Sequence, residues 1–279
     1  MIIVIAGPTG VGKSKIAIEL AKKIDAEIIS ADAYQVYKEM NIGTAKVKEE
    51  ETLGVKHYMI DVYEVKENVD VKKYQEDARK ILNDLISKNK NVIICGGTGL
   101  YIKALLYDYK FYEEEESDKY KDLSLEELQK LLPLDALVDK NNKRRVVRYL
   151  EKLDSGIKTE KSPKLYDFYM IGLTKDREEI YEKINLRVEE MLKEGLIEEV
   201  KELYLKYQDA RSITSAIGYK EIISYLNKKI TKEEAIEKIK TNSRRYAKRQ
   251  YTFFNNQFDT KWIKKDDKTL EKILDLINL

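Results

Sequence analysis

The sequence predicts an α/β fold, in which helices pack against a parallel sheet, together with a small helical insertion domain. Three observations support this prediction. Short apolar runs alternate with amphipathic segments up to residue 110, residues 111–164 are highly charged and helix-prone, and the chain after Asp176 is helical almost throughout. We therefore assign residues 1–110 and 165–279 to an α/β core and residues 111–164 to the insertion.

Five apolar segments have the length and composition of strands that are buried on both faces, as in parallel sheets. They are residues 1–6, 26–30, 57–62, 91–95 and 166–173. One helix follows the first segment, and a second amphipathic helix covers residues 71–86. Ligands of such folds gather at the carboxyl ends of the strands, where we expect Gly7, Asp32 and Gly96.

The remaining segments are predicted more coarsely. Four successive glutamates, residues 113–116, exclude a sheet interior for that part of the insertion. In the C-terminal part, breaks in the helical pattern are expected near Gly195, across residues 212–218 and around Phe258.

Composition excludes several classes of protein. The 279 residues contain 52 Lys+Arg and 50 Asp+Glu, with a single cysteine and a single histidine. Cys95 alone excludes a disulfide scaffold and a cysteine metal cluster, and it fits a reducing cytosol. His57 alone excludes a two-histidine metal site and disfavours a Ser-His-Asp triad. No apolar run reaches the roughly 18 residues of a membrane span, so we expect a cytoplasmic protein without a membrane partner.

A glycine-rich motif between the first strand and the first helix predicts a site for a diphosphate or triphosphate. Such a loop surrounds phosphate oxygens with backbone N–H groups, the lysine neutralises charge, and the hydroxyl of the last residue can ligate Mg²⁺. The motif matches GxxxxGK[ST] at every position and consists of Gly7, Pro8, Thr9, Gly10, Val11, Gly12, Lys13 and Ser14.

Two further strand ends carry polar residues. A nucleoside triphosphatase usually has a strand that ends in an aspartate near its Mg²⁺, but the strand at residues 91–95 ends in Cys95 and two glycines. Asp32 follows the second strand and could act as a general base, orient metal-bound water or only cap a helix. Thr98 lies in a glycine-rich turn, where either contact with a ligand or helix capping would explain it.

Two basic segments stand out against the near-neutral total charge. Residues 211–258 hold eleven Lys and Arg against four Asp and Glu, and residues 143–148 hold four cations and no acid. In residues 243–254, cations alternate with aromatic residues, an arrangement that suits an RNA backbone and unstacked bases. A solvated amphipathic helix with core aromatics is the alternative interpretation.

Together these motifs resemble the bacterial tRNA dimethylallyltransferase (tRNA isopentenyltransferase) family over nearly the whole chain. The resemblance implies a P-loop NTPase-like sheet and the transfer of a dimethylallyl group from dimethylallyl diphosphate to N6 of adenosine 37, next to the anticodon, with release of diphosphate. The segments that carry it are residues 7–14, 32–37, 42–46, 57–61, 96–101, 144–148, 217–221 and 244–252.

The resemblance also implies roles for individual residues. The catalytic residues would be Asp32 as the base, Lys13 beside the leaving diphosphate, and Thr98 in contact with the target nucleotide. Ser14 would hold Mg²⁺, and we expect a monomer. The positions that correspond to tRNA-binding residues of the family are Asp32, Ala33, Tyr34, Gln35, Thr98, Arg144, Arg145, Arg148, Gly218, Tyr219, Arg244 and Arg249.

The chain departs from the family pattern at a few positions. Ala33 replaces a serine, Val47 a proline, and Phe253 and Asn255 replace tryptophan and arginine. We expect catalysis to survive these changes, while tRNA affinity or selectivity changes.

Three other functions are compatible with parts of the sequence. They are an isopentenyltransferase of free adenine nucleotides, an ATP-dependent small-molecule kinase with a P-loop, and an RNA-binding protein that a nucleotide switches. The two basic segments disfavour the first two.

Overall fold

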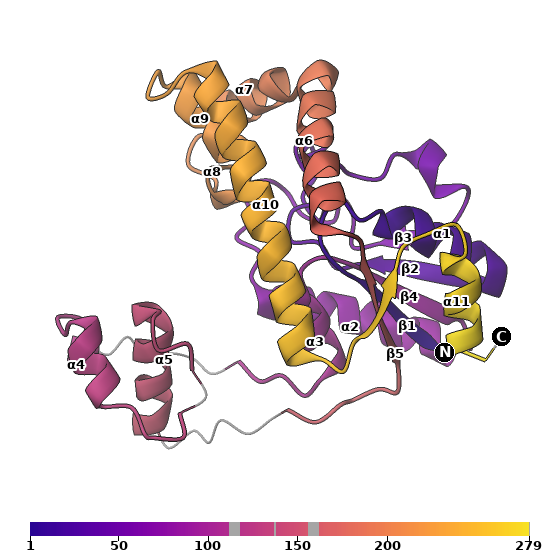
Figure 1. The fold of residues 1–279 in the computed structure, drawn as a ribbon, viewed down its shortest axis with the longest axis horizontal. Coiled ribbons are helices and arrows are strands. Elements are labelled where there is room, and N and C mark those ends of the chain that lie inside the picture. The colour runs from indigo at the N-terminus through magenta and orange to yellow at the C-terminus, as the bar shows by residue number, and fades with distance from the viewer. Residues whose placement is uncertain (112–117, 137, 156–161, 279) are drawn as a thin grey trace. The chain divides into compact units, whose positions relative to one another are not determined.

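The computed structural model describes residues 1–111, 118–136, 138–155 and 162–278 and divides into two compact units. The sheet unit comprises Met1–Tyr107 and Lys164–Leu279, and the helical unit comprises Asp108–Pro163 (Figure 1). The glutamate run at residues 113–116 lies outside the described residues, so the prediction made for it stays a prediction.

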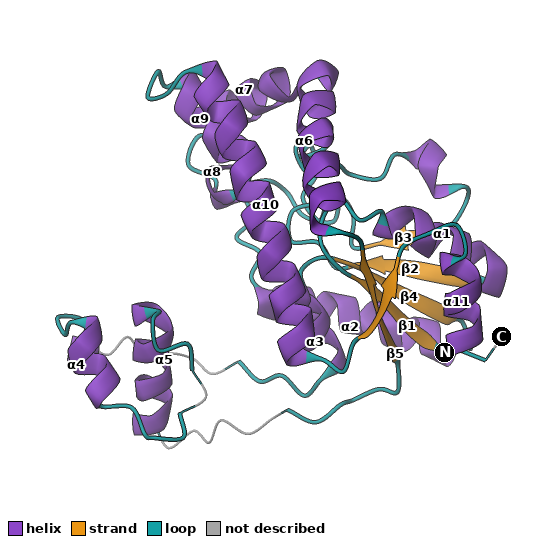
Figure 2. Cartoon of the chain, in the orientation of Figure 1, coloured by secondary structure: helices purple, strands orange, loops and turns teal. Residues whose placement is uncertain are grey.

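A six-stranded parallel sheet forms the centre of the sheet unit, as the sequence predicts (Figure 2). Its strand order is β3-β2-β4-β1-β5-β6. The strands are β1 (Ile2–Ala6), β2 (Ala26–Ser30), β3 (His57–Tyr58), β4 (Asn91–Gly96), β5 (Tyr169–Thr174) and β6 (Lys261–Lys264).

The two edge strands differ from the sequence prediction. The segment at residues 57–62 was expected to be a full strand, but only His57–Tyr58 pairs with β2. Met59 and Asp61 have positive φ angles of 59° and 55°, which end the extended backbone. Strand β6 was not predicted; it pairs with β5 after the helical C-terminal region.

Helices cover both faces of the sheet and fill the C-terminal part of the unit (Figure 2). The predicted breaks at Gly195 and Gly218 separate helices, whereas residues 212–215 are helical. The helices are α1 (Lys13–Ile24), α2 (Val71–Ser87), α3 (Gly99–Leu106), α6 (Arg177–Glu194), α7 (Leu196–Tyr207), α8 (Arg211–Ser215), α9 (Tyr219–Leu226), α10 (Lys232–Gln257) and α11 (Thr269–Leu276), with the short 3₁₀ helix η1 (Glu49–Thr52).

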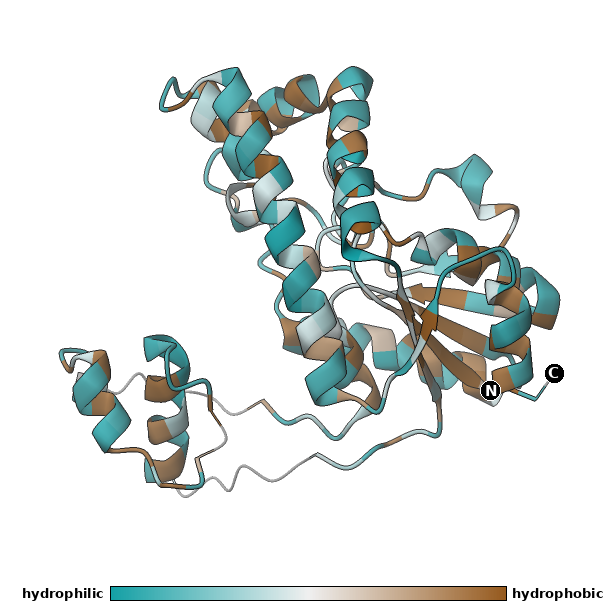
Figure 3. Ribbon diagram, viewed as in Figure 1, coloured by the Kyte–Doolittle hydropathy of each residue, from teal (hydrophilic) through white to brown (hydrophobic). Residues whose placement is uncertain are grey.

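The apolar core lies on both sides of the sheet. Ile3 and Ile5 of β1 face a cluster that contains α1 and α11, while Val4 and Ala6 face the cluster that contains α2, α3 and the C-terminal helices. Alternate residues of a strand point to opposite faces, so burial of both faces explains an apolar run without alternation (Figure 3).

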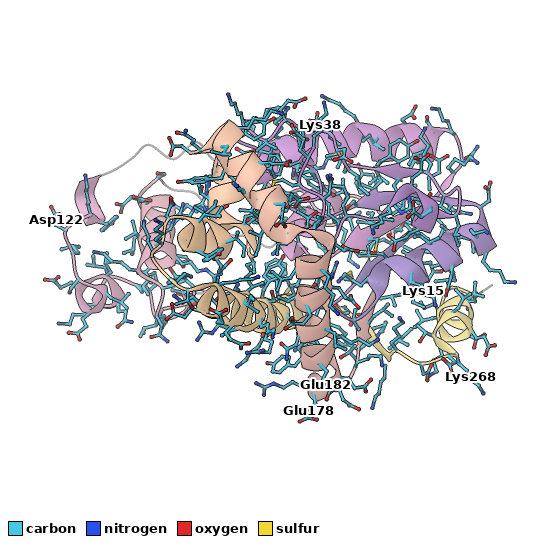
Figure 4. The ribbon with its side chains drawn as sticks, turned by 90° about the horizontal axis from the view of Figure 1, so that it is seen from above. Lys15, Lys38, Asp122, Glu178, Glu182 and Lys268 are labelled. Carbon is cyan, nitrogen blue, oxygen red and sulfur yellow. The ribbon has the colours of Figure 1, made fainter. Side chains whose placement is uncertain are left out.

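Charged side chains, by contrast, project into solvent from the outside of the ribbons, as Lys38, Glu178 and Lys268 do (Figure 4). In the part of the chain that the structure describes, no helix combines the length and the apolar character that crossing a membrane requires.

The helical unit has a small core of its own. It contains η2 (Asp118–Tyr120), α4 (Leu125–Lys130) and α5 (Lys143–Asp154). Ser124 and Glu127 form a capping box at the start of α4, and the Asn142 side chain accepts from the Arg145 backbone N–H at the start of α5. The core residues of this unit are Tyr120, Leu128, Val146 and Leu150.

Candidate active site

The glycine-rich loop joins β1 to α1 with the backbone shape that its motif predicts. Gly10 and Gly12 have positive φ angles of 82° and 87°, a region that residues with a Cβ rarely adopt. Gly12 precedes the first residue of α1, so the loop and the first helical turn present backbone N–H groups together. The positive end of the helix dipole adds to the attraction for an anion.

Lys13 points back over this loop. Its Nζ donates to the carbonyl oxygen of Pro8 at 2.9 Å. Burial lowers the pKa of Lys13 to about 8, and Arg187 acts in the same direction, while Cys95 and Asp32 act against it. The lowered pKa means that the nearby negative groups do not compensate the buried ammonium for its lost hydration. An anionic ligand would supply the missing negative charge.

Asp32 lies in a tight turn after β2. One carboxylate oxygen, Oδ1, accepts from the backbone N–H groups of Tyr34 at 2.9 Å and Gln35 at 3.3 Å. These bonds fix the carboxylate and leave its other oxygen available for a ligand. The side-chain amide of Gln35 donates to the carbonyl oxygens of Thr44 and Ala45, both at 3.2 Å, and so joins this turn to the next loop.

Thr98 supports the Asp32 turn. Its hydroxyl accepts from the backbone N–H of Ala33 at 3.0 Å, while its own N–H donates to the Ala31 carbonyl oxygen at 3.0 Å. Thr98 lines neither of the two cavities described below. The structure therefore gives it a contact with the turn, and the predicted contact with the target nucleotide stays a prediction.

Gln250 of α10 connects the glycine-rich loop to the turn after β4. Its Oε1 accepts from the Thr9 N–H at 2.8 Å, and its Nε2 donates to the Gly97 carbonyl oxygen at 3.0 Å. A Cβ at position 97 would lie 2.0 Å from Nε2, so only glycine allows this close approach. Gln250 lies within the basic segment at residues 243–254, where the sequence motifs indicated no role for it.

Arg187 of α6 is a site residue that the sequence analysis missed. Its guanidinium donates to the Thr9 hydroxyl and to the Ala45 carbonyl oxygen, both at 3.4 Å. Burial lowers its pKa, although an arginine stays charged at neutral pH. One feature of the sequence could have indicated this role. Arg187 directly precedes Val188 on a helix that buries Ile184 and Val188, so this arginine borders the apolar face of the helix.

Two cavities meet at this site. The first contains Lys13, Ser14 and the ends of β2 and β4, and the second opens between α6, α9 and α10 and is larger, at about 260 Å³. Five residues line both cavities: Thr9, Asp32, Thr44, Arg187 and Tyr246. Burial, and then Asp32, raise the pKa of Tyr246, so its hydroxyl stays neutral beside that carboxylate. The arrangement can hold an anion in one cavity and a second reactant in the other, with a carboxylate between them.

The second cavity depends on Glu199 of α7, another residue that the sequence analysis missed. Its carboxylate accepts from the backbone N–H groups of Asn41, Ile42 and Gly43 at 2.8–3.1 Å, and from the Tyr219 hydroxyl at 2.6 Å. The Tyr219 ring packs against Gly43 and has no exposed surface.

This burial bears on the predicted tRNA surface. Tyr219 was predicted to face tRNA, but the structure places it in the core, where it supports the cavity wall. Gly218 lines the second cavity beside it, and Tyr34 of the Asp32 turn lies on the same wall and contacts the Ser215 hydroxyl at 3.2 Å.

The four basic residues between positions 244 and 249 of α10 divide into two groups. Arg244 is half-buried and donates to Asn185 at 2.7 Å and to Thr241 at 2.9 Å, so it joins α10 to α6. Arg245, Lys248 and Arg249 are exposed, and Arg249 also lines the second cavity. Arg244 is therefore held within the fold, while the other three present their charge to solvent.

The predicted arginines of the insertion lie on α5 of the helical unit. Arg144, Arg145 and Arg148 are all exposed, and Arg145 forms an ion pair with Asp139 at 3.5 Å. Arg148 lies three and four residues after the other two, so these cations share one side of the helix.

The single cysteine and the single histidine both line the first cavity. Cys95 is buried, as expected, and its burial raises the pKa of the thiol to about 11. The His57 ring approaches the Val55 carbonyl oxygen at 2.8 Å, and burial lowers its pKa. Among the described residues, no group of three or more His, Cys, Asp or Glu side chains is arranged to hold a metal ion.

Comparison with known proteins identifies the family of this chain. The sequence model described as IPP transferase matches residues 35–257. The chain belongs to this family. A tRNA dimethylallyltransferase of Anoxybacillus flavithermus is 43% identical over 286 residues, which cover 96% of this chain and 92% of that protein. A protein of the same name from Bacillus anthracis is 45% identical over 280 residues, which cover 93% and 89%.

Solved structures of IPP transferases share the fold. A full-length tRNA isopentenylpyrophosphate transferase from Bacillus halodurans superimposes with a TM-score of 0.80 at 37% identity, covering 99% of this chain and 95% of that one. A eukaryotic dimethylallyltransferase acting on tRNA gives a TM-score of 0.79 at 25% identity, covering 99% and 78%. This IPP transferase chain therefore has the family's architecture over its whole length.

Proposed function

We propose that this protein is a tRNA dimethylallyltransferase that prenylates N6 of adenosine 37, next to the anticodon. The chain's membership of the family supports this reaction, as do relatives with this name that match the chain over most of their length. These findings do not favour a free-nucleotide transferase or a kinase. The observation that carries the proposal is the pair of cavities that share Asp32 and Arg187. A transferase must hold two substrates with their reacting atoms in contact.

The first cavity is suited to dimethylallyl diphosphate. Backbone N–H groups of residues 7–14 and the cations of Lys13 and Arg187 would surround the diphosphate. As the bond between the allyl carbon and the bridging oxygen breaks, negative charge grows on the leaving diphosphate. These preorganised cations would stabilise that charge, and the buried Lys13 ammonium, whose pKa is lowered by desolvation, would gain a counter-charge.

The residues present also suit Mg²⁺ bound together with the diphosphate. Ser14 lines this cavity and offers a hydroxyl oxygen, the kind of donor that Mg²⁺ prefers, while phosphate oxygens and water would complete its shell. When bound, the ion would neutralise charge on the diphosphate.

We assign the role of the base to Asp32, which lines both cavities. The N6 lone pair attacks the allyl carbon, the electron pair of the C–O bond leaves with diphosphate, and the excess N6 proton passes to a carboxylate oxygen of Asp32. The adenine would enter through the second cavity, which Arg249 and Tyr34 line, and it must leave its stack to do so. The exposed cations of α10 and α5 would bind tRNA phosphates. We expect the enzyme to act as a cytoplasmic monomer.

Mass spectrometry of an anticodon stem-loop RNA tests the function directly. The RNA is incubated with the protein, Mg²⁺ and either dimethylallyl diphosphate or ATP. We expect one adenosine to gain a single five-carbon group with the allyl donor alone. Unchanged RNA together with prenylated AMP, or with ATP consumption, would overturn the proposal.

A further inference from the structure

A third cavity lies on another side of α10 and has no part in the proposed chemistry. Its volume is about 310 Å³, within the range of small-ligand sites. Its wall is mostly apolar or aromatic, and three cations surround it. It is lined by Pro8, Thr174, Lys175, Arg177, Ile180, Tyr181, Ala247, Lys248 and Tyr251. Only Pro8 belongs to the glycine-rich loop, next to the Thr9 that lines the other two cavities.

Tyr251 gives this cavity an aromatic face that is rigid and open to solvent. Its ring packs on the Trp262 ring with centroids 4.5 Å apart and an angle of 32° between the planes. The residue is nevertheless 42% exposed. A second aromatic residue, Tyr181, lies under the Arg177 guanidinium at 5.1 Å from its ring centroid.

An exposed arc of cations joins this cavity to the second cavity of the proposed active site. Lys248 precedes Tyr251 by three residues, Arg245 precedes Lys248 by three, and Arg249 follows Arg245 by four. Residues three and four apart are neighbours on a helix surface. In spatial order, Tyr251, Lys248, Arg245 and Arg249 therefore follow one another around the solvent side of α10. All three cations are exposed, and the last of them lines the second cavity.

We propose that this third cavity binds one unstacked nucleobase of the tRNA substrate, stacked on Tyr251, while the backbone crosses the cation arc to the target adenosine. This proposal rests on the proposed tRNA substrate. Aromatic rings bind any base through its π face, and cations beside the ring bind the adjoining phosphates. The apolar wall suits the base, and the continuous arc supplies a path for the backbone. The occupant is a loop nucleotide other than the modified one.

A coupling experiment between Tyr251 and the RNA tests the proposal. Anticodon stem-loops that each carry one abasic nucleotide are titrated with wild-type enzyme, Tyr251→Ala and Tyr251→Phe. We expect one loop position, distinct from the target, where loss of the base weakens wild-type binding about 5- to 150-fold. Tyr251→Ala should lose a similar factor with intact RNA and nothing more with that abasic RNA, whereas Tyr251→Phe should retain affinity.

Kinetics separate this role from catalysis. Tyr251→Ala should raise the KM for RNA, while kcat and the KM for dimethylallyl diphosphate stay within about twofold, because a remote base contributes equally before and during reaction. Leu205→Ala is the matched control: this residue of α7 is 70% exposed and lines none of the three cavities, so it should change nothing.

The single tryptophan provides a readout that needs no variant. Because Trp262 lies against Tyr251, a base that stacks there should change its fluorescence, and the abasic RNA identified above should not. The inference would be overturned if Tyr251→Ala and each abasic substitution weakened binding independently, or if Trp262 fluorescence were the same with and without the base. In that case the enzyme would still prenylate RNA. If wild-type enzyme prenylates no RNA at all, the proposed function itself is wrong.

Discussion

Lys13 shows how a single residue can make substrate binding depend on pH. Its pKa of about 8 in the free enzyme means that the ammonium form dominates below pH 8 and the neutral amine above it. A bound diphosphate stabilises the ammonium form and raises this pKa. Protonation is therefore linked to binding, and affinity falls as pH rises above the free-enzyme value.

We predict a dissociation constant for dimethylallyl diphosphate that is flat from pH 7 to 8 and then rises about tenfold per pH unit. Isothermal titration calorimetry would measure it. Lys13→Arg is the control, because a guanidinium stays charged throughout this range and should remove the rise. A flat profile in the wild type would contradict the assignment of Lys13 to the diphosphate.

Asp32 combines a structural contact with a proposed chemical role, and two substitutions separate them. An asparagine retains the oxygen that accepts from Tyr34 and Gln35 but cannot take up a proton. Asp32→Asn should lower kcat about 10²- to 10⁴-fold, with both substrates bound within about twofold of the wild type. Single-turnover rates and equilibrium titrations would measure both. Near-normal turnover in Asp32→Asn, with an inactive Asp32→Ala, would leave Asp32 only its structural role.

At the scale of elements, Glu199 holds the loop at residues 41–43 against α7 and α9. Its carboxylate satisfies three backbone N–H groups and the buried Tyr219 hydroxyl. Removal of the carboxylate leaves these donors without partners, and each such donor that stays away from water costs about 1–3 kcal/mol.

We predict that Glu199→Ala lowers the free energy of unfolding by about 2–4 kcal/mol and that Glu199→Gln costs less, because an amide oxygen still accepts. Urea denaturation would measure the change. Glu198→Ala is the matched control on the exposed side of the same helix and should change stability by less than about 0.5 kcal/mol. Equal effects of Glu199→Ala and Glu198→Ala would show that Glu199 does not hold the loop.

The elements also show where sequence patterns succeed. Strands β1 and β4 were predicted because both of their faces are buried, which produces apolar runs, and β2 was predicted from a shorter apolar segment around Ile28 and Ile29. Strand β6 was missed because Lys261 and Lys264 flank only two apolar residues, so the segment carries little strand signal. Its backbone pairing with β5 makes it a strand, and the local sequence does not specify that pairing.

At the scale of the whole molecule, the helical unit is joined to the sheet unit at two points that lie close together. Tyr107 and Lys164 form an isolated antiparallel bridge, and the Leu165 N–H donates to the Leu106 carbonyl oxygen at 2.9 Å. The chain therefore leaves the sheet unit and returns to it at adjacent positions, which is the usual geometry of a tolerated insertion.

We predict that replacing residues 109–162 by a short glycine-serine linker leaves the sheet unit folded and able to bind dimethylallyl diphosphate. Binding of tRNA should weaken at least tenfold. The slope of the logarithm of the binding constant against the logarithm of the salt concentration should fall in magnitude by about three, one for each lost arginine of α5. Melting temperature, calorimetry and tRNA titrations at several salt concentrations would measure this. Triple alanine substitution of Arg144, Arg145 and Arg148 is the control for charge alone. Unchanged tRNA affinity in both variants would remove the helical unit from the proposed interface.

The sequence by itself determined the α/β class, the glycine-rich loop at residues 7–14 and the family, because these depend on local patterns and on motifs in a fixed order. Only the tertiary structure decided which side chains meet. Arg187 and Gln250, on two different helices, both contact Thr9. Tyr219, which was expected at the RNA surface, is buried in the core. Such contacts join residues more than a hundred positions apart, and no local pattern encodes the packing that creates them.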